Sequence, residues 1–337
     1  MADVAVVILN YNGAKYLEKF LPAVIEYSKE AQIYVVDNNS NDDSIQLLRD
    51  QFNQVNLIEF EVNHGFTRGY NLALQQIQSE YYVLLNSDVE VTEHWIEPIV
   101  HFMNANPEVA ACQPKVLAYH SRDHFEYAGA AGGFIDILGY PYCRGRIFET
   151  LEQDDGQYND IKQVFWASGC CLFIRSSVFH ELDGFRQEFF AHMEEIDLCW
   201  RINLTGRKVF CIPESHVYHV GGGTLAKSNP RKTYLNFRNN LAMLFINGRI
   251  RENIWKIPIK VIFDWLAAIK FWRENSFAHF AAVFQSHFDF LCNLRNNISR
   301  RSKVRRTATK KAVEPPLRYL IPFSYFILGK KKYSDMN

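Results

Sequence analysis

The alternation of short apolar runs with amphipathic stretches over residues 4–88 is the feature that most constrains how this chain can fold. Four of the runs have the length and composition of buried parallel strands, and they lie at residues 4–9, 33–36, 55–60 and 81–85. Helical patterns occupy the intervals, and Ser40 and Asp43 have the spacing of a capping box before the second helix. The alternation predicts an α/β fold with a mostly parallel sheet and helices on both faces.

A polar cluster follows each of the four predicted strands. The clusters are Asn10-Tyr11-Asn12, Asp37-Asn38-Asn39-Ser40, Asn63-His64-Gly65 with Arg68 and Asn71, and Asn86-Ser87-Asp88. One such cluster alone predicts only a turn. All four, however, should lie along one edge of the sheet, where open α/β sheets bind nucleotides. Together they predict a nucleotide site, in which Asp37 can accept hydrogen bonds from a base or ribose and the helix start at Gly65 offers N–H groups to an anion.

The charge distribution divides the chain in two. The formal net charge of the 337 residues is zero, but residues 1–226 carry 15 Lys and Arg against 31 Asp and Glu, and residues 227–337 carry 22 against 6. Net charges of −16 and +16 imply two parts with different partners. From residue 227 onward the periodicity is helical. We therefore expect an α/β domain over residues 1–226 and a basic amphipathic helical region over 227–337.

The cysteines and the N-terminus indicate a reduced, cytoplasmic protein. None of the seven cysteines has a Cys-x-x-Cys spacing, which argues against a zinc site and a disulfide framework. The N-terminus has no basic region before its first apolar run, so a secretory signal is not expected. No uncharged apolar stretch has the length that spans a bilayer.

Six motifs give the chain a resemblance to a known family. They read Val-Val-Ile-Leu-Asn-Tyr-Asn-Gly at 6–13, Val-Val-Asp-Asn-Asn-Ser at 35–40, Asn-His-Gly-Phe-Thr-Arg-Gly-Tyr-Asn at 63–71, Leu-Leu-Asn-Ser-Asp-Val-Glu-Val at 84–91, Ala-Ser-Gly-Cys-Cys-Leu-Phe-Ile-Arg at 167–175 and Met-Glu-Glu-Ile-Asp-Leu-Cys-Trp-Arg at 193–201. With them the chain resembles the inverting glycosyltransferases of family two, which have the GT-A fold, and most of all their bacterial rhamnosyltransferase-type branch. The resemblance covers residues 4 to about 225, and residues 231–245 also look like that branch.

The resemblance implies a nucleotide-diphospho-sugar donor (a dTDP-, UDP- or GDP-sugar) and Mg²⁺ or Mn²⁺. Asp37 would contact the base, Asp88 would hold the cation that bridges the donor diphosphate, and His219 would reach the cation or the diphosphate. Asn86 stands where many relatives have an acid, so this triplet supplies one carboxylate rather than two. The residues expected at the donor are Asn10, Asn12, Asp37, Asn39, Gly65, Arg68, Asn71, Asn86, Ser168 and Gly169.

The resemblance also implies a division of the first domain. The nucleotide-sugar half is expected over about residues 1–117 and the acceptor half over about 118–226, with a loop or hairpin insertion at 118–160. Trp166, Ser168 and Gly169 resemble the acceptor-side wall, where an aromatic face can stack on a sugar ring. A place in the core is the alternative for Trp166.

The catalytic base of an inverting transfer removes the proton of the acceptor hydroxyl. The resemblance places this base in an acidic pair at the start of a helix, which here is Glu194-Glu195, followed by Asp197. Glu195 occupies the base position, and Glu194 and Asp197 are its rivals. Adjacent acids raise one another's pKa, which suits a base. Acids at a helix N-terminus can also serve only to complement the helix dipole.

The basic region suggests a membrane partner. Helical spacing over residues 255–272 puts Lys256, Lys260, Asp264 and Lys270 on one side and leaves a broad apolar face. Residues 295–311 hold eight basic residues and no acid. Apolar faces beside cationic clusters favour an anionic membrane surface, with solvated packing as the alternative, and nucleic acid is not expected.

The leading hypothesis is a glycosyltransferase, peripheral on the inner face of the cell membrane, that moves a sugar to a lipid-linked or cell-surface glycan; a homodimer is left open. A non-catalytic glycan or membrane adaptor on the same fold is a second hypothesis, because Asn86 and Glu195 depart from the family pattern. A sugar-phosphate nucleotidyltransferase is less favoured. That class should carry a glycine-rich, Arg-bearing loop after the first strand, where this chain has Tyr11-Asn12-Gly13.

Overall fold

The computed structural model describes residues 3–221, 229–274, 276–309 and 319–336. The strands of its main sheet are β1 (Val4–Asn10), β2 (Gln32–Asp37), β3 (Asn56–Glu59), β4 (Tyr81–Leu85), β5 (Val89–Val91), β6 (Val109–Ala118), β7 (Ser121–Phe125), β12 (Lys162–Val164), β13 (Cys171–Arg175) and β14 (Lys208–His219). The helices that cover this sheet are α1 (Ala14–Glu26), α2 (Ser44–Gln51), α3 (Gly65–Leu74), α4 (Glu97–Ala105), α5 (Ser176–Glu181) and α6 (Glu194–Leu204).

The strand order of the main sheet is β12-β14-β6-β13-β4-β1-β2-β3, with β5 paired to β14 and β7 to β6. β1 runs parallel to β2 and β4, and β6 runs parallel to β14, whereas β13 and β12 are antiparallel to their neighbours. All four strands expected over residues 4–88 are present. The prediction of a mostly parallel α/β sheet is confirmed.

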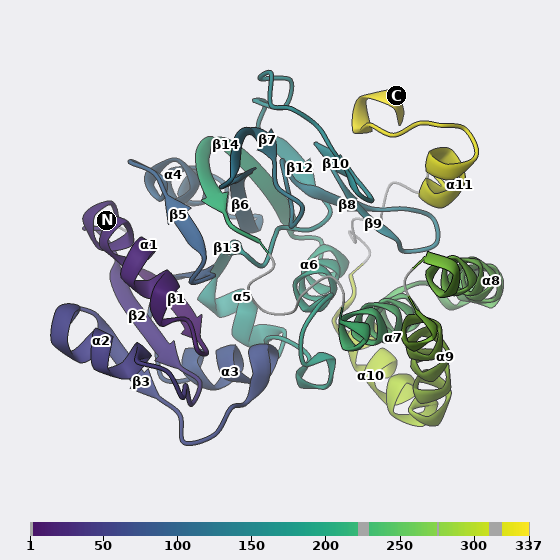
Figure 1. Cartoon of the computed structure of the whole chain (residues 1–337), viewed down its shortest axis with the longest axis horizontal. Helices are drawn as coiled ribbons and strands as arrows, with labels where there is room; N and C mark the ends of the chain where they lie inside the picture. The colour runs from purple at the N-terminus through teal and green to yellow at the C-terminus, as the bar shows by residue number, and fades with distance from the viewer. Residues whose placement is uncertain (1–2, 222–228, 275, 310–318, 337) are drawn as a thin grey trace.

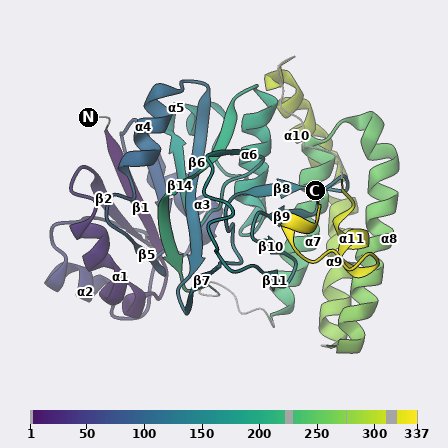
Figure 2. The ribbon, with the colours of Figure 1, turned by 90° about the horizontal axis from the view of Figure 1, so that it is seen from above.

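Helices pack on both faces of the sheet, as Figures 1 and 2 show. Because side chains alternate along a strand, neighbouring residues of β1 enter different cores. Val6 packs in one apolar core with α1, α2 and α4, and Val7 packs in the other with α3, α5 and α6. The carboxyl ends of β1, β2 and β4 are thereby held side by side at one edge.

The predicted capping box before α2 is wrong. Asp43 makes no side-chain cap hydrogen bond. Instead the backbone N–H of Ser44 donates to Asp42 Oδ1 over 3.1 Å, so Asp42 satisfies the helix start. Ser40 Oγ accepts from the backbone N–H of Asn12 over 2.9 Å and therefore belongs to the edge of the sheet.

Residues 118–160 are a folded insertion. After β7 they form a second sheet of β8 (Gly133–Ile135), β9 (Pro141–Cys143), β10 (Arg146–Ile147) and β11 (Thr150–Leu151), in the order β11-β10-β9-β8. Tyr333, near the C-terminus, stacks on Phe134 and Tyr142 of this sheet with ring centres 5.8 and 6.3 Å apart. The last part of the chain thus packs on the insertion.

The C-terminal region is helical, as expected. It contains α7 (Pro230–Asn247), α8 (Ile250–Glu274), α9 (Phe277–Cys292), α10 (Leu294–Thr307) and the short α11 (Ile321–Phe326). α7 packs against α6, α8, α9 and α10, and so joins this region to the sheet-bearing part. The domain boundary at residues 226 and 227 remains a proposal; β14 ends at His219 and α7 begins at Pro230.

Candidate active site

Two of the residues predicted to contact the nucleotide-sugar donor, Asn10 and Asp37, meet at the ends of β1 and β2. Their register pairs Asn10 with Asp37, and Asn10 Nδ2 donates to Asp37 Oδ1 over 3.1 Å. The other oxygen, Asp37 Oδ2, accepts from the backbone N–H of Ser40 over 2.8 Å. Asn10 and Asp37 are buried, and Asn10 Oδ1 has no hydrogen-bond partner among the described residues. The edge of the sheet therefore holds the fixed carboxylate of Asp37 beside the amide oxygen of Asn10, which can still accept a hydrogen bond.

The turns after β1, β2 and β4 meet next to this pair. Asn12 has a left-handed backbone with a φ of 53°, and its Oδ1 accepts from the backbone N–H of Asn41 over 2.7 Å. Asn39 is also left-handed, with a φ of 64°, and its side chain is exposed. A Cβ on Gly13 would lie 3.5 Å from Ser87 Oγ, so the first turn touches the Asn-Ser-Asp turn.

The start of α3 carries three of the residues predicted at the sugar donor, of which two are occupied within the protein. The backbone N–H of Gly65 donates to Asn63 Oδ1 over 2.8 Å, so it is not free for an anion as expected. Gly65 has a φ of 72°, and a Cβ there would come within 2.6 Å of the Phe190 ring. Arg68 is exposed on α3. Asn71 is buried, with Nδ2 donating to the Phe185 carbonyl over 2.7 Å and Oδ1 accepting from the Phe185 N–H over 2.9 Å. Because both ends of its amide hold the backbone at Phe185, Asn71 is a structural residue rather than a donor ligand.

Asp88 lies in a buried cluster with His219 and Glu126, which we call the Asp88 cluster. The antiparallel register of β14 and β5 sets His219 opposite Val89, and the backbone N–H of Val220 donates to the Asp88 carbonyl over 3.0 Å. His219 Nε2 lies 3.2 Å from Asp88 Oδ1, and His219 Nδ1 lies 3.2 Å from Glu126 Oε2. Glu126 follows β7 directly; no sequence motif marks it, so sequence reasoning missed it.

Contacts within the protein outweigh burial in setting the pKa values of Asp88 and His219. Burial alone would raise the pKa of Asp88, but the hydrogen bond and charge of His219, with backbone N–H groups, bring that pKa below its ordinary value. Burial alone would lower the pKa of His219, yet its contacts with Asp88 and Glu126 raise it well above the ordinary value. The cluster thus favours an imidazolium beside an ionised Asp88.

The donor set of Asp88 and His219 fits a divalent cation. Across residues 3–221, 229–274, 276–309 and 319–336, no group of three or more His, Cys, Asp or Glu side chains is arranged to hold a metal ion. A Mg²⁺ ion, however, is commonly held by one or two protein ligands together with substrate phosphates and water. His219 must be neutral to ligate a metal, so binding there would release its proton.

Glu194 and Glu195, the acidic pair, open α6. Glu194 is buried and Glu195 is partly exposed, and the Oε2 atom of each has no hydrogen-bond partner within the described part of the chain. Burial, with the charge of Glu195, raises the pKa of Glu194 well above its ordinary value. Burial raises the pKa of Glu195 to about 7, although backbone N–H groups oppose the shift. A partly exposed carboxylate with this pKa and an unpaired oxygen has what a general base needs near neutral pH.

Asp197, two residues further along α6, is in a different electrostatic state. It is fully buried; Oδ1 accepts from Arg186 Nε over 3.0 Å and from Asn247 Nδ2 over 2.7 Å, and Oδ2 accepts from Arg201 Nε over 2.7 Å. Burial alone would raise the pKa of Asp197, but the two arginine charges lower it. Because it is held ionised and its oxygens are occupied, Asp197 is an anchor of α6 and a poor candidate for the base.

Residues 168–170 connect the acidic pair with the Asp88 cluster. A Cβ on Gly169 would lie 3.6 Å from Glu195 Cγ. Burial raises the pKa of the Cys170 thiol to about 11, and its charge interactions with His219 and Glu126 place it beside the Asp88 cluster. The Cys170 carbonyl accepts from the backbone N–H of Asn86 over 2.9 Å. Asn86, the Asp88 cluster and Glu195 therefore meet at this segment.

Ser168 and Trp166 are not exposed to a substrate. Ser168 is buried; its N–H donates to Gln113 Oε1 over 2.8 Å, and its hydroxyl donates to the Ala128 carbonyl. Trp166 is buried as well, and its Nε1 donates to the Phe134 carbonyl over 2.8 Å. Trp166 is a core residue, and Ser168 holds its own segment in place.

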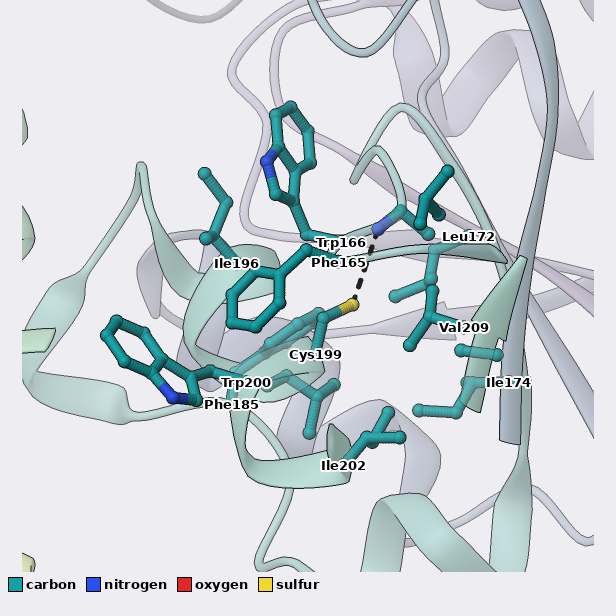
Figure 3. Close-up of a cluster of buried hydrophobic side chains, with 14 of the residues drawn as sticks. Phe165, Trp166, Leu172, Ile174, Phe185, Ile196, Cys199, Trp200, Ile202 and Val209 are labelled. Carbon is teal, nitrogen blue, oxygen red and sulfur yellow. Dashed lines mark hydrogen bonds between the residues drawn. The ribbon is translucent and has the colours of Figure 1, made fainter. Parts of the chain in front are cut away.

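The apolar core fixes the end of α6 that carries the acidic pair. Figure 3 shows Ile196, Cys199 and Trp200 of α6 in one buried cluster with Phe165 and Trp166. The backbone N–H of Ala167, next to Trp166, donates to Cys199 Sγ over 3.4 Å. This packing sets the position of Glu195 relative to residues 168–170.

The loop before α6 is strained and is held from α7. Phe190, His192 and Met193 have φ angles of 64°, 69° and 69°, a region that non-glycine residues rarely adopt. Asn239 Nδ2 donates to three carbonyls of this loop over 2.8 to 3.0 Å. Backbone strain of this kind is concentrated at functional sites. Asn239 lies in the 231–245 stretch that resembles the rhamnosyltransferase branch, but its contact with the loop could not be read from the sequence.

Comparison with known families identifies the class of protein. Residues 5–183, more than half of the chain, match Glycosyl transferase family 2. The chain belongs to this family, and the family resemblance of its motifs is confirmed. It is a glycosyltransferase of the GT-A fold that uses a nucleotide-sugar donor.

Several curated proteins are similar to the chain at low identity. The N-acetylglucosaminyl-diphospho-decaprenol L-rhamnosyltransferase of Mycobacterium tuberculosis is 24% identical over 280 residues, which cover 77% of this chain and 89% of the relative. The low-salt glycan biosynthesis hexosyltransferase Agl10 of Haloferax volcanii is 22% identical, covering 84% and 89%. The rhamnosyltransferase WbbL of Escherichia coli is 23% identical, covering 64% and 83%.

Solved structures share the fold. S. aureus TarS 1-349 in complex with UDP-GlcNAc has a TM-score of 0.57 at 16% identity, covering 90% of this chain and 91% of that chain. The mannosyltransferase PcManGT of Pyrobaculum calidifontis, in complex with GDP-Man and Mn²⁺, has a TM-score of 0.51 at 13% identity, covering 91% and 88%.

Proposed function

We propose that this protein is an inverting hexosyltransferase, of the rhamnosyltransferase kind, that moves a sugar from a nucleotide-diphosphate sugar to a hydroxyl of a lipid-linked or cell-surface glycan. The observation that carries the proposal is Glu195, whose pKa is raised to about 7 and whose Oε2 is unpaired. It lies beside Gly169, on the segment that leads to the Asp88 cluster. The name of the similar Mycobacterium tuberculosis protein supports a lipid-linked acceptor.

The donor half would bind and orient the nucleotide. Asn10 and Asp37 offer an acceptor edge to the base and ribose, and the exposed Asn39 and Arg68 lie on the turn after β2 and on α3. Asn86 begins the turn that leads to Asp88. Asp88 and His219 would hold Mg²⁺ or Mn²⁺, which supplies neutralisation of the charge that develops on the leaving diphosphate.

The acceptor chemistry would belong to Glu195. Its carboxylate takes the proton of the acceptor hydroxyl while the hydroxyl oxygen forms a bond to the anomeric carbon. The bond from that carbon to the nucleoside diphosphate breaks with its electron pair on the diphosphate. Because the hydroxyl attacks the face opposite this leaving group, the configuration inverts. Glu194, more deeply buried and with a pKa raised further, would stay protonated beside it.

The acceptor implies a site of action at the cytoplasmic face of a membrane with anionic lipids. No helix among the described residues is long and apolar enough to cross a membrane. Three cations of the basic run at 295–311 are engaged within the protein. Arg301 and Arg305 donate to carbonyls at the end of α7, including that of Gly248, and Arg300 pairs with Glu188 over 2.5 Å. These three cations hold protein together rather than face a lipid.

A donor and acceptor panel tests the proposal. Purified protein is incubated with dTDP-, UDP- and GDP-sugars, with and without Mn²⁺, and with N-acetylglucosaminyl-diphospho-polyprenol as acceptor. We expect product with one donor class, with inverted anomeric configuration by NMR. Retained configuration would contradict the direct role of Glu195 as base. Donor binding without transfer or hydrolysis would favour the non-catalytic adaptor.

A further inference from the structure

The helix α8 carries its charged residues on the inside. Its buried side chains recur every three to four residues and form one stripe: Asn253, Lys256, Lys260, Asp264 and Ala268. The sequence spacing predicts that Lys256, Lys260, Asp264 and Lys270 share one side of the helix. The first three are buried together there, whereas Lys270 is exposed, so the prediction is wrong for Lys270. In the structure this side faces the protein, so the apolar side of α8 faces outward.

The buried charges of α8 are neutralised within the protein. The Tyr140 hydroxyl donates to Asp264 Oδ1 over 2.6 Å, and Lys260 Nζ and His287 Nε2 each lie 3.2 Å from an Asp264 oxygen. Lys260 Nζ also lies 3.7 Å from the centre of the Tyr140 ring. Because these groups satisfy one another, the charged side of α8 does not need water.

The outward side of α8 is apolar and exposed. Between Glu252 and Lys270 its exposed residues are all uncharged, and they include Ile254, Trp255, Ile262, Trp265, Leu266 and Ile269. Ile262 is 61% exposed and Leu266 is 58% exposed. Contiguous apolar surface of this kind marks a site of contact with another apolar phase.

The helix α9 extends this surface. Phe284 and Phe288 of α9 are exposed, and the rings of Trp265 and Phe284 lie 5.9 Å apart. At the end of α8, Lys270 Nζ lies 4.8 Å from the ring of Phe326 in α11, which is exposed too. Figures 1 and 2 place α8 and α9 at the opposite end of the molecule from α1 and α2. We call this surface the α8–α9 face.

We propose that the α8–α9 face inserts into the interfacial layer of an anionic lipid bilayer, with α8 and α9 lying in the plane of the membrane. The inference rests on the membrane partner in the proposed function, and it assigns the contact to apolar insertion rather than to the basic run of α10. Exposed cations stand at both ends of the apolar stretch, Arg251 before it and Arg273 after it, and Lys331 and Lys332 follow α11. An apolar helix face between cationic ends is the pattern of helices that lie in the headgroup layer.

Charge complementarity favours lipid over a second copy of the chain. A twofold dimer with α8 packed along α8 would set the cationic helix ends of one copy against those of the other. Anionic headgroups would neutralise Arg251 and Arg273 instead. The net charge of +16 in residues 227–337 points the same way.

The tryptophans of the protein provide a selective probe. Trp255, Trp265 and Trp272 are exposed on α8, whereas Trp95, Trp166 and Trp200 are buried. Full-length protein is mixed with phosphatidylcholine–phosphatidylglycerol vesicles whose acyl chains are brominated. We expect co-flotation with the vesicles and loss of the emission of the three α8 tryptophans. Binding should weaken in 1 M salt but persist, because apolar burial is not screened.

A matched pair of variants tests the face itself. Ile262→Glu should weaken vesicle binding at least about tenfold, because it removes apolar burial and adds a charge in the interface. Ile161→Glu makes the same exchange at an exposed position of the catalytic part and should bind as wild type does. Neither residue lies in the proposed active site, and circular dichroism and thermal unfolding check that both variants fold. Since vesicle binding is read without any donor, its failure is distinguishable from a failure of catalysis.

Several results would overturn the insertion. Equal binding by Ile262→Glu and wild type, vesicle binding without quenching, or complete release in 1 M salt would each contradict it. A dimer in sedimentation that Ile262→Glu dissociates, with no vesicle binding by the wild type, would assign the face to a second copy of the chain.

Discussion

The Asp88 cluster and the acidic pair hold carboxylates in opposite electrostatic states. In the cluster His219 lies 3.2 Å from Asp88, and this contact together with backbone N–H groups outweighs burial, so the pKa of Asp88 is lowered. In the acidic pair burial outweighs the backbone N–H groups, so the pKa of Glu195 is raised to about 7. The same side-chain chemistry is thus prepared as a permanent anion in one place and as a proton acceptor in the other.

The contrast shows that a carboxylate in this site is held ionised where a cationic side chain contacts it, and has a raised pKa where no cation does. Asp197 is an internal control, because it is fully buried and lies two residues from Glu195. Two arginines lower its pKa and occupy both of its oxygens. Of the three acids on this turn, only Glu195 is both unpaired at one oxygen and partly exposed.

The largest effect is expected from Asp88→Asn. Loss of the anion removes the contact with His219 and the carboxylate that would hold a cation, so transfer should be abolished and donor binding should no longer respond to Mg²⁺ or Mn²⁺. Turnover and donor affinity by calorimetry, each over a metal titration, measure this. The exposed Asp123→Asn is the matched control and should act as wild type does. An Asp88→Asn enzyme that retains metal-dependent turnover would refute the cation site.

Asp197→Asn should act on stability. Removing one member of a buried ion pair leaves Arg186 and Arg201 without their partner and costs about 3–5 kcal/mol of the free energy of unfolding. The folded pKa of Asp197 is lowered, so its stabilisation is present above the unfolded pKa and lost as pH falls through the folded value. Urea unfolding at neutral and acid pH checks both points. A variant as stable as wild type but inactive would make Asp197 the base.

Glu195→Gln distinguishes the proposed role of Glu195 as catalytic base from the structural role of Asp197. It should lower kcat about 10²-fold or more and leave donor affinity unchanged, because only the proton acceptor is lost. Glu194→Gln is the control on the same turn and should keep most of the activity. The reverse result, an inactive Glu194→Gln beside a nearly normal Glu195→Gln, would assign the base to Glu194.

Much of the fold was predictable because its signals are local. Apolar runs and the residues after them mark β1, β2 and β4, and parallel pairing then brings Asn10 next to Asp37. The capping box failed because Ser40, adjacent to α2 in sequence, is used by the turn after β1. A local pattern states which hydrogen bonds a side chain can make, but tertiary contacts choose among them.

The parts that could not be predicted depend on distant partners. Glu126 enters the Asp88 cluster through the return of β7 onto β6, and Asn247 reaches Asp197 from α7. Neither contact produces a periodic pattern in the sequence from which it could be predicted. The spacing of Lys260 and Asp264 predicts that they share a side of α8, but only the position of Tyr140 and its neighbours shows that this side is buried.

The smallest expected effect is a pH dependence that distinguishes the two acid sites in the unmodified enzyme. The cation is held at a saturating concentration, so that the proton of His219 is released throughout the profile. With the pKa of Glu195 at about 7, protonation removes the base as pH falls, so kcat/KM should drop about tenfold per unit below that pH and level off above it. Asp88 should contribute nothing to this limb, because its lowered pKa keeps it ionised there. The measurement is a pH profile of wild type and Glu195→Gln with one donor and one acceptor. The residual activity of Glu195→Gln should not fall with pH in this range. If it still falls, the group that titrates is another residue, and the raised pKa of Glu195 does not determine the pH dependence of the rate.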